Sequence, residues 1–179
     1  NDGAEFRPVI RPPRPLFCGG FCRLGLRRFL EAGAGLIGHV NNGSCDLEIG
    51  QIGYAAASRA FAMAGISHAD IDMVSIYDCY TITVLMTLED AGFCPKGKAA
   101  EFIHSHDLSY RGDFPCNPHG GQLSFGQTGM AGGMHHVIDG ARQIMGRAGG
   151  NQVRDCNRAF ISGNGGIMSE QVVLILEGA

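Results

Sequence analysis

The stretch NPHGGQLSFGQTGMAGGMHH, residues 117–136, decides the fold of this chain. It reads as a turn, a short bridge, a second glycine-rich turn and then a segment with helical spacing. Its glycines are Gly120, Gly121, Gly126, Gly129, Gly132 and Gly133. Glycine adopts positive φ and lets a ligand approach main-chain N–H groups closely. A glycine-rich turn that enters a helix can therefore hold an anion or a polarised carbonyl; the alternative is a structural loop packed between two layers.

The composition of the chain is that of a globular protein with few charges. Of its 179 residues, 45% are hydrophobic and 17% are charged, and the formal net charge is −3. Binding to nucleic acid usually needs a clustered basic face, which this balance does not supply. No apolar run reaches the ~18 residues that a membrane-spanning helix needs. We therefore expect neither nucleic-acid binding nor a membrane span.

The seven cysteines are scattered along the chain. Cys18 and Cys22 form a C-x3-C pair, but no second Cys/His pair follows at the spacing of a zinc site, so no metal site is predicted. No secretory signal opens the chain. Free thiols and a cytoplasmic location are the simplest interpretation.

Residues 1–49 differ from the rest of the chain. They hold four of the seven prolines, and six arginines without an acidic residue lie between Arg7 and Arg28. A solvated arm is the favoured interpretation of this segment, and a contact with phosphate or a partner is the alternative. Because the chain starts at Asn1 without a methionine, we expect it to be a fragment or a processed product.

From residue 50 onward the hydrophobic periodicity predicts the order α-β-α-β-α-β-β. Helices are predicted over 51–64, 81–91 and 129–146, with a capped turn at 67–70; strands over 71–77, 114–117, 158–162 and 172–176; and an irregular stretch over 95–113 and a turn at 163–166. The uninterrupted apolar strand 172–176 is expected at the centre of its sheet. This alternation predicts an α/β fold, a mixed sheet with helices on its faces. The buried side of the last helix is predicted to comprise Met130, Met134, Val137, Ile138, Ala141, Ile144 and Met145.

Three stretches resemble the C-terminal domain of the thiolase superfamily in their order and spacing. They are YDCYT (77–81), NPHGGQLSFGQTGMAGG (117–133) and ISGNGGIMSEQVVLIL (161–176). The resemblance implies a thiolase-like C-terminal domain over residues 50–179, and residues 1–49 could be a remnant of the N-terminal thiolase half. Within the superfamily, Tyr77-Asp78-Cys79-Tyr80 is similar to the motif of the sterol-carrier and lipid-transfer branch.

The chain departs from a working thiolase at two places. Where the family has Gly-His-Pro, this chain has Gly126-Gln127-Thr128, and its last glycine-rich loop, 162–166, has no cysteine. Glutamine can donate a hydrogen bond to an oxyanion but cannot shuttle a proton near neutral pH. Claisen chemistry by the usual route is therefore not expected from this half, and Cys156 is interpreted as a core residue.

Some lipid-transfer relatives are thought to be aldolases that use tyrosine as acid and base. Tyr77 stands where the resemblance places a catalytic tyrosine, but a second tyrosine is expected near Phe125, where this chain has phenylalanine. The resemblance implies two catalytic residues, Tyr77 and Gln127. The substrate-binding residues that it implies are Asp78, Asn117, His119, Gly120, Gly121, Phe125, Gly129, Gly163, Asn164, Gly165 and Gly166.

Each candidate also has a structural interpretation. Tyr77 is equally consistent with a packed, hydrogen-bonded core tyrosine, and Asp78 more often orients a backbone turn than does chemistry. His119, His135 and His136 lie near the loop, and each is more often a satisfied or solvent-facing histidine than a site residue.

The leading hypothesis is an acyl-CoA-handling, thiolase-like protein of the lipid-transfer type. It would cleave a β-hydroxyacyl-CoA, such as a sterol side chain, by a retro-aldol reaction. One alternative is a non-catalytic thiolase-like structural or partner subunit, and another is a thiolase acyltransferase whose nucleophile half is missing from this chain. No cofactor is expected beyond coenzyme A in the thioester substrate. The resemblance implies a homo-oligomer and a zinc-ribbon/OB-fold protein partner.

Overall fold

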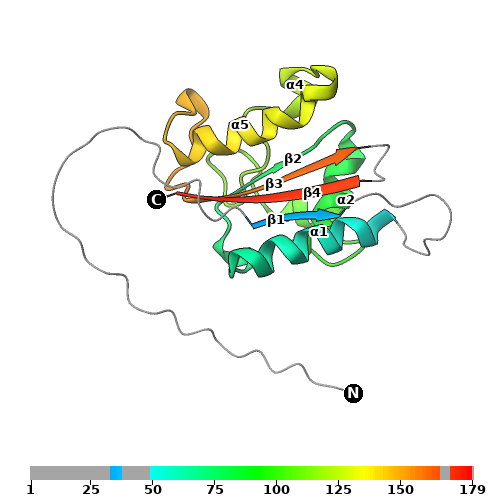
Figure 1. Ribbon diagram of the computed structural model, residues 1–179. Coiled ribbons are helices and arrows are strands. Elements are labelled where there is room, and N and C mark those ends of the chain that lie inside the picture. The colour runs from blue at the N-terminus through cyan, green and yellow to red at the C-terminus, as the bar shows by residue number, and fades with distance from the viewer. Residues whose placement is uncertain (1–32, 38–48, 166–169, 179) are drawn as a thin grey trace, which may run out of the picture.

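The computed structural model describes residues 33–37, 49–165 and 170–178. Some of the sequence-based predictions concern residues outside the described ones, namely Cys18, Cys22, the arginine-rich arm and Gly166. The described residues form one sheet with helices on both of its faces (Figure 1).

The sheet of the described residues has four strands in the order β1-β4-β3-β2. These strands are β1 (Gly33–Ile37), β2 (Met73–Ile76), β3 (Arg158–Gly165) and β4 (Glu170–Glu177). β2 runs parallel to β3, whereas β4 is antiparallel to both of its neighbours. The mixed α/β sheet confirms the predicted fold class, and the apolar β4 is an inner strand, as predicted.

Helices cover both faces of this sheet. Figure 1 shows α1 (Ile49–Ala64) along one face and α5 (Gly132–Ile144) along the other. α2 (Thr81–Asp90) follows β2 and packs against α1. Two short helices, α3 (Ala99–Ser105) and α4 (Gly121–Phe125), lie in the long connection from α2 to α5. Three 3-10 turns complete the described elements: His68–Asp70, Gly129–Ala131 and Gly149–Asn151.

The core is divided by the sheet into two layers. On the α1 side, Phe160 packs with Val74, Ile76 and the small residues Ala56 and Ala60 of the helix. On the α5 side, the neighbouring β3 residues Ala159 and Ile161 pack with Met73 and Leu176. Successive strand residues point to opposite faces, so β3 contributes to both layers and is buried from Ala159 to Ser162.

The predicted turn at 67–70 is confirmed by its hydrogen bonds. Asp70 Oδ2 accepts the backbone N–H of Ser67 at 2.9 Å and its hydroxyl at 2.8 Å. This arrangement uses the acid three residues beyond the cap, as the sequence indicated. The turn leads the chain from α1 directly into β2.

Three predicted segments differ from the structure. The stretch 95–113 contains α3, which is anchored because Ala99 N donates to Glu89 Oε1 at 3.0 Å and Phe102 packs edge-on against Phe114. The strand predicted over 114–117 is reduced to one bridge between Val74 and Cys116. Pro115, which has no N–H, offers only its carbonyl to the ladder. Finally, β3 does not turn at residue 163 but pairs with β4 as far as Gly165.

The predicted buried face of α5 is wrong at four positions. Val137, Ala141 and Ile144 pack against the sheet as predicted, but the large side chains at the other four positions are exposed: Met130, Met134, Ile138 and Met145. The helix instead buries Gly132, His136, Asp139, Gly140 and Gln143. Gly140 lets α5 approach β3 closely, because a Cβ there would lie 2.7 Å from Ile161 Cδ1. The polar residues are accommodated because each finds a hydrogen-bond partner inside the fold.

Candidate functional site

Tyr77 lies where β2 leaves the sheet. Its backbone N–H donates to the carbonyl of Ser162 at 3.1 Å, which is the last contact between β2 and β3. β3 continues to Gly165 without β2 beside it. Gly163, Asn164 and Gly165 therefore lie at the same carboxyl edge of the parallel pair as Tyr77, and such edges are where ligands bind in open α/β sheets.

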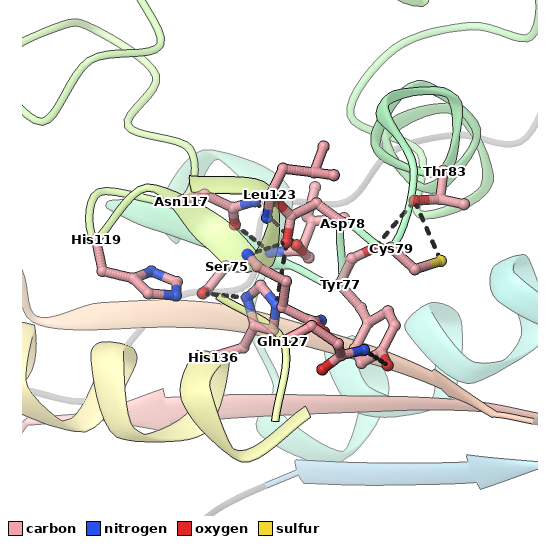
Figure 2. Close-up of polar contacts among 12 residues, drawn as sticks. Ser75, Tyr77, Asp78, Cys79, Thr83, Asn117, His119, Leu123, Gln127 and His136 are labelled. Carbon is pink, nitrogen blue, oxygen red and sulfur yellow. Dashed lines mark hydrogen bonds and ion pairs between the residues drawn. The ribbon is translucent and has the colours of Figure 1, made fainter. Parts of the chain in front are cut away.

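Gln127 meets Tyr77 across this edge. Its side-chain amide donates to the Tyr77 hydroxyl oxygen at 3.2 Å, as Figure 2 shows. The Tyr77 ring also faces Gly133, where an added Cβ would lie 3.8 Å from it, and its centroid is 5.8 Å from that of the His136 imidazole. The two side chains predicted to be catalytic, 50 residues apart in sequence, are thus in direct contact.

Asp78 is buried and binds the start of α4. Oδ1 accepts the backbone N–H of Gln122 at 2.7 Å, and Oδ2 accepts that of Leu123 at 3.2 Å. Helix N-termini leave such donors unsatisfied, and a carboxylate suits the positive end of the helix. These contacts favour the interpretation that Asp78 orients the backbone over the prediction that it binds substrate.

Asn117 and His119 are also engaged with the protein. Asn117 adopts φ 48° and pairs with the backbone of Ile76, accepting its N–H at 2.7 Å and donating to its carbonyl at 2.9 Å. His119 Nδ1 contacts Asp139 Oδ2 at 3.0 Å, while its Nε2 is buried without a hydrogen-bond partner in the described part of the fold. Of these two predicted substrate-binding residues, only His119 keeps an unused polar atom.

His136 joins three elements at the centre of the site. Its Nδ1 is 2.9 Å from Ser75 Oγ of β2, and its Nε2 is 3.2 Å from the Gln122 amide nitrogen and 3.4 Å from Asp78 Oδ1. Burial, reinforced by the nearby His119, lowers the pKa of His136 to about 4, although Asp78 and Asp139 oppose this shift. The imidazole is therefore neutral near pH 7 and must bear its one proton on either Nδ1 or Nε2.

Four of the six glycines in residues 117–136 have the positive φ that the sequence indicated, and the other two lie in α5. Gly120, Gly121, Gly126 and Gly129 adopt positive φ, from 66° to 126°. This backbone brings Gln127 back over Tyr77. Phe125 is 64% exposed, with its ring 5.9 Å from that of His119. The described residues of the second predicted loop, Gly163 to Gly165, are half-buried and belong to β3.

Sequence reasoning missed Ser75 and Gln122, which are both buried partners of His136. One signal was available for Ser75, because a polar residue inside the apolar run IDMVSIY must find a partner when it is buried. Gln122 follows two glycines and gave no comparable signal. His136 itself was recognised only as one of three nearby histidines.

Two of the described cysteines have buried thiols with a raised pKa. Cys156 is a core residue, as predicted, and burial raises its pKa to about 12. Burial beside Asp78 likewise raises the pKa of Cys116 to about 12.

Within residues 33–37, 49–165 and 170–178, no group of three or more His, Cys, Asp or Glu side chains is arranged to hold a metal ion. No helix among them is long and apolar enough to cross a membrane.

Comparison with known proteins gives consistent results. Residues 46–178 match the family described as thiolase C-terminal domain-like. The chain is 32% identical over 127 residues to the steroid side-chain-cleaving aldolase of Thermomonospora curvata, covering 71% of this chain and 30% of that protein. It is 34% identical over 105 residues to sterol carrier protein 2 of Gallus gallus, covering 59% and 19%.

Two further relatives extend this picture. An acetyl-CoA acetyltransferase of Methanothermobacter thermautotrophicus is 34% identical over 114 residues, covering 62% of this chain and 30% of the enzyme. The solved Ltp2-ChsH2(DUF35) aldolase superposes with a TM-score of 0.59 at 31% identity, covering 71% of this chain and 31% of that one. The chain thus spans less than a third of each relative's length. The match over residues 46–178 shows that this chain belongs to the thiolase C-terminal domain-like family.

Proposed function

We propose that this protein handles acyl-CoA thioesters and cleaves a β-hydroxyacyl-CoA, such as one with a steroid side chain, by a retro-aldol reaction. The observation that carries the proposal is the contact between the Tyr77 hydroxyl and Gln127 at the open carboxyl edge of β2 and β3. The names of the aldolase relatives and of a 17-hydroxy-3-oxo-4-pregnene-20-carboxyl-CoA lyase from Mycobacterium tuberculosis, 31% identical, support this substrate class.

In the proposed reaction, Tyr77 is the base that takes the proton from the β-hydroxyl group. The bond between Cα and Cβ then breaks, the β-carbon becomes a carbonyl, and the electron pair moves into the thioester as an enolate. Returning the proton to Cα gives the shortened acyl-CoA, so no other reactant is consumed. Retro-aldol chemistry needs only such a base and donors for the enolate oxygen.

The enolate oxygen requires hydrogen-bond donors at the same edge. β2 pairs with β3 only as far as Ser162. From Gly163 to Gly165, this edge of β3 has no neighbouring strand among the described residues. We assign the enolate to main-chain N–H groups of Gly163 to Gly165 and to the Asn164 amide. Coenzyme A enters as part of the substrate, and the reaction as written uses no other cofactor.

The test is a retro-aldol assay of a β-hydroxyacyl-CoA with the complete protein and with Tyr77→Phe. Loss of activity in the variant, with unchanged binding of a CoA thioester, supports Tyr77 as the base. Tyr80→Phe is the matched control, because this neighbouring tyrosine is 69% exposed. Equal activity of the wild type and Tyr77→Phe would exclude this mechanism.

A second candidate function is a non-catalytic thiolase-like partner subunit. The observation that favours it is the apolar stripe of Met130, Met134, Ile138 and Met145, which the described fold leaves exposed. Exposed apolar surface of this kind marks contacts with other proteins or domains. A folded sample that binds no CoA thioester would favour this function over the lyase.

We also propose a homo-oligomer in the cytoplasm that pairs with a zinc-ribbon/OB-fold protein. The name of the superposed structure joins two components, which supports a partner protein. Cys79, Cys94, Cys116 and Cys156 form no disulfide with one another, which suits a reducing compartment. Co-purification with a candidate partner, followed by measurement of the mass of the complex, tests this proposal.

A further inference from the structure

The buried amide of Gln122 lies between His136 and Gln127, and its two ends are not equally satisfied. Its nitrogen is 3.2 Å from His136 Nε2, whereas its oxygen is buried without a hydrogen-bond partner among the described residues. Leaving a buried acceptor unsatisfied is costly. A half-turn of the amide exchanges the oxygen and nitrogen without moving the rest of the side chain.

A second observation concerns the surroundings of Gly132. The side-chain oxygens of Gln122 and Gln127 both lie against the position that a Cβ on Gly132 would occupy. Two amide oxygens repel each other unless a donor lies between them. Turning Gln122 places its NH2 group toward the oxygen of Gln127 and its own oxygen toward His136.

The third observation favours a proton on Nε2 of His136. The Asp78 carboxylate lies 3.4 Å from Nε2, and the Ser75 hydroxyl lies 2.9 Å from Nδ1. A carboxylate favours a proton on the ring nitrogen that it faces. With the proton on Nε2, the Ser75 hydroxyl donates to Nδ1, and the turned Gln122 oxygen accepts from Nε2–H.

We propose that Gln122 relays a directed hydrogen-bond chain from His136 to Tyr77. In this chain His136 Nε2–H donates to Gln122, Gln122 donates to Gln127, and Gln127 donates to the Tyr77 hydroxyl oxygen. Every donor points toward Tyr77, so the chain stabilises negative charge on its oxygen. Gln122 and His136 are positioning residues that act through Gln127, and the consequence for catalysis rests on the proposed role of Tyr77.

The charged and titratable groups around His136 leave the direction of the hydrogen-bond chain unchanged near neutral pH. Asp78 and Asp139 act electrostatically on His136 from the β2–α2 loop and from α5, and His119 and His135 do so from the loop before α4 and from α5. Since the low pKa keeps His136 neutral, its tautomer and not its charge sets the direction of the chain.

The first experiment determines the His136 tautomer by nitrogen-15 NMR of the 179-residue chain at pH 7. A proton on Nε2 is expected, and a proton on Nδ1 would overturn the proposal. This measurement does not depend on any enzymatic activity.

The second experiment compares Gln122→Met with Gln127→Met, and because Gln127 is exposed its substitution is expected to leave the fold intact. Both variants should shift the tyrosinate absorbance titration of Tyr77, obtained by subtracting Tyr77→Phe, to higher pH. Both should also lower kcat about tenfold with an unchanged dissociation constant for the CoA thioester. Gln152→Met is the matched control, because Gln152 donates to the Gln143 carbonyl instead.

The outcomes separate this inference from the proposed function. If Gln127→Met shifts the titration but Gln122→Met does not, the chain does not pass through Gln122 and the inference is wrong. If the tautomer and both titration shifts are as expected but the wild type cleaves no β-hydroxyacyl-CoA, the hydrogen-bond chain stands and the lyase proposal fails.

Discussion

Gly121 lies so close to the Asp78 carboxylate that a Cβ on Gly121 would overlap with its oxygens. The same residue adopts φ +66°, which side chains rarely tolerate. Gly121 therefore does two things at once, because it makes the turn into α4 and allows Asp78 to reach the N–H groups of that helix. This contact joins the Tyr77-Asp78 motif to the glycine-rich stretch.

The first prediction separates these two roles of Gly121 by means of a matched control. Gly97→Ala meets only backbone strain, since Gly97 has φ +76° and open space around its Cα. It should lower the free energy of unfolding by about 1 kcal/mol. Gly121→Ala adds the collision with Asp78 and should cost at least about 2 kcal/mol more. Urea denaturation measures both, and equal losses would contradict the close contact.

The second prediction concerns the carboxylate itself. Asp78→Asn replaces one buried acceptor by an amide NH2 group, which must face a backbone N–H of α4. The variant should lose about 2 kcal/mol of unfolding free energy. Asp155→Asn is the control, because that side chain is exposed and asparagine tolerates its φ of 50°. Equal stability of the two variants would show that Asp78 does not hold α4.

Much of the fold followed from the sequence because short apolar strands alternate with segments of helical periodicity. The contact between Tyr77 and Gln127 could be approached only through family resemblance, since nothing in the long intervening sequence predicts that distance. The orientation of α5 could not be predicted from periodicity. Its methionines have the spacing of a buried face, yet glycines and hydrogen-bonded polar residues pack better against β3.

The hydrogen-bond network around His136 could not be predicted from the sequence for the same reason. A buried histidine is stable only if tertiary partners satisfy both ring nitrogens, and those partners come from β2 and α4. Sequence spacing gives the period of a helix but not the elements that it will meet.

The third prediction is a pH dependence of stability due to His136. Its pKa of about 4 in the folded state lies below the ordinary value of 6.5, so the unfolded chain binds more protons between these values. The full contribution to stability is present above pH 6.5 and is lost as the pH falls toward 4, and the loss amounts to about 3 kcal/mol. The measurement is the free energy of unfolding at several pH values for the wild type and His136→Gln.

The difference between these two curves isolates His136 from Asp78, Asp139, His119 and His135, which remain in both proteins. It should shrink steadily from pH 6.5 to pH 4. A difference that stays constant over this range would mean that His136 is not held neutral by burial.

The fourth prediction tests the corrected orientation of α5 with two isoleucines of the same helix. Ile138 is 52% exposed, whereas Ile144 packs against the core beneath β3. Ile138→Ser should change the free energy of unfolding by at most about 0.5 kcal/mol, while Ile144→Ser should cost about 2 kcal/mol or more. Because the two exchanges are chemically identical, helix propensity cancels and only burial differs. If Ile138→Ser proved as costly as Ile144→Ser, the apolar stripe would have to be covered in the folded chain, and its availability to a partner would fall with it.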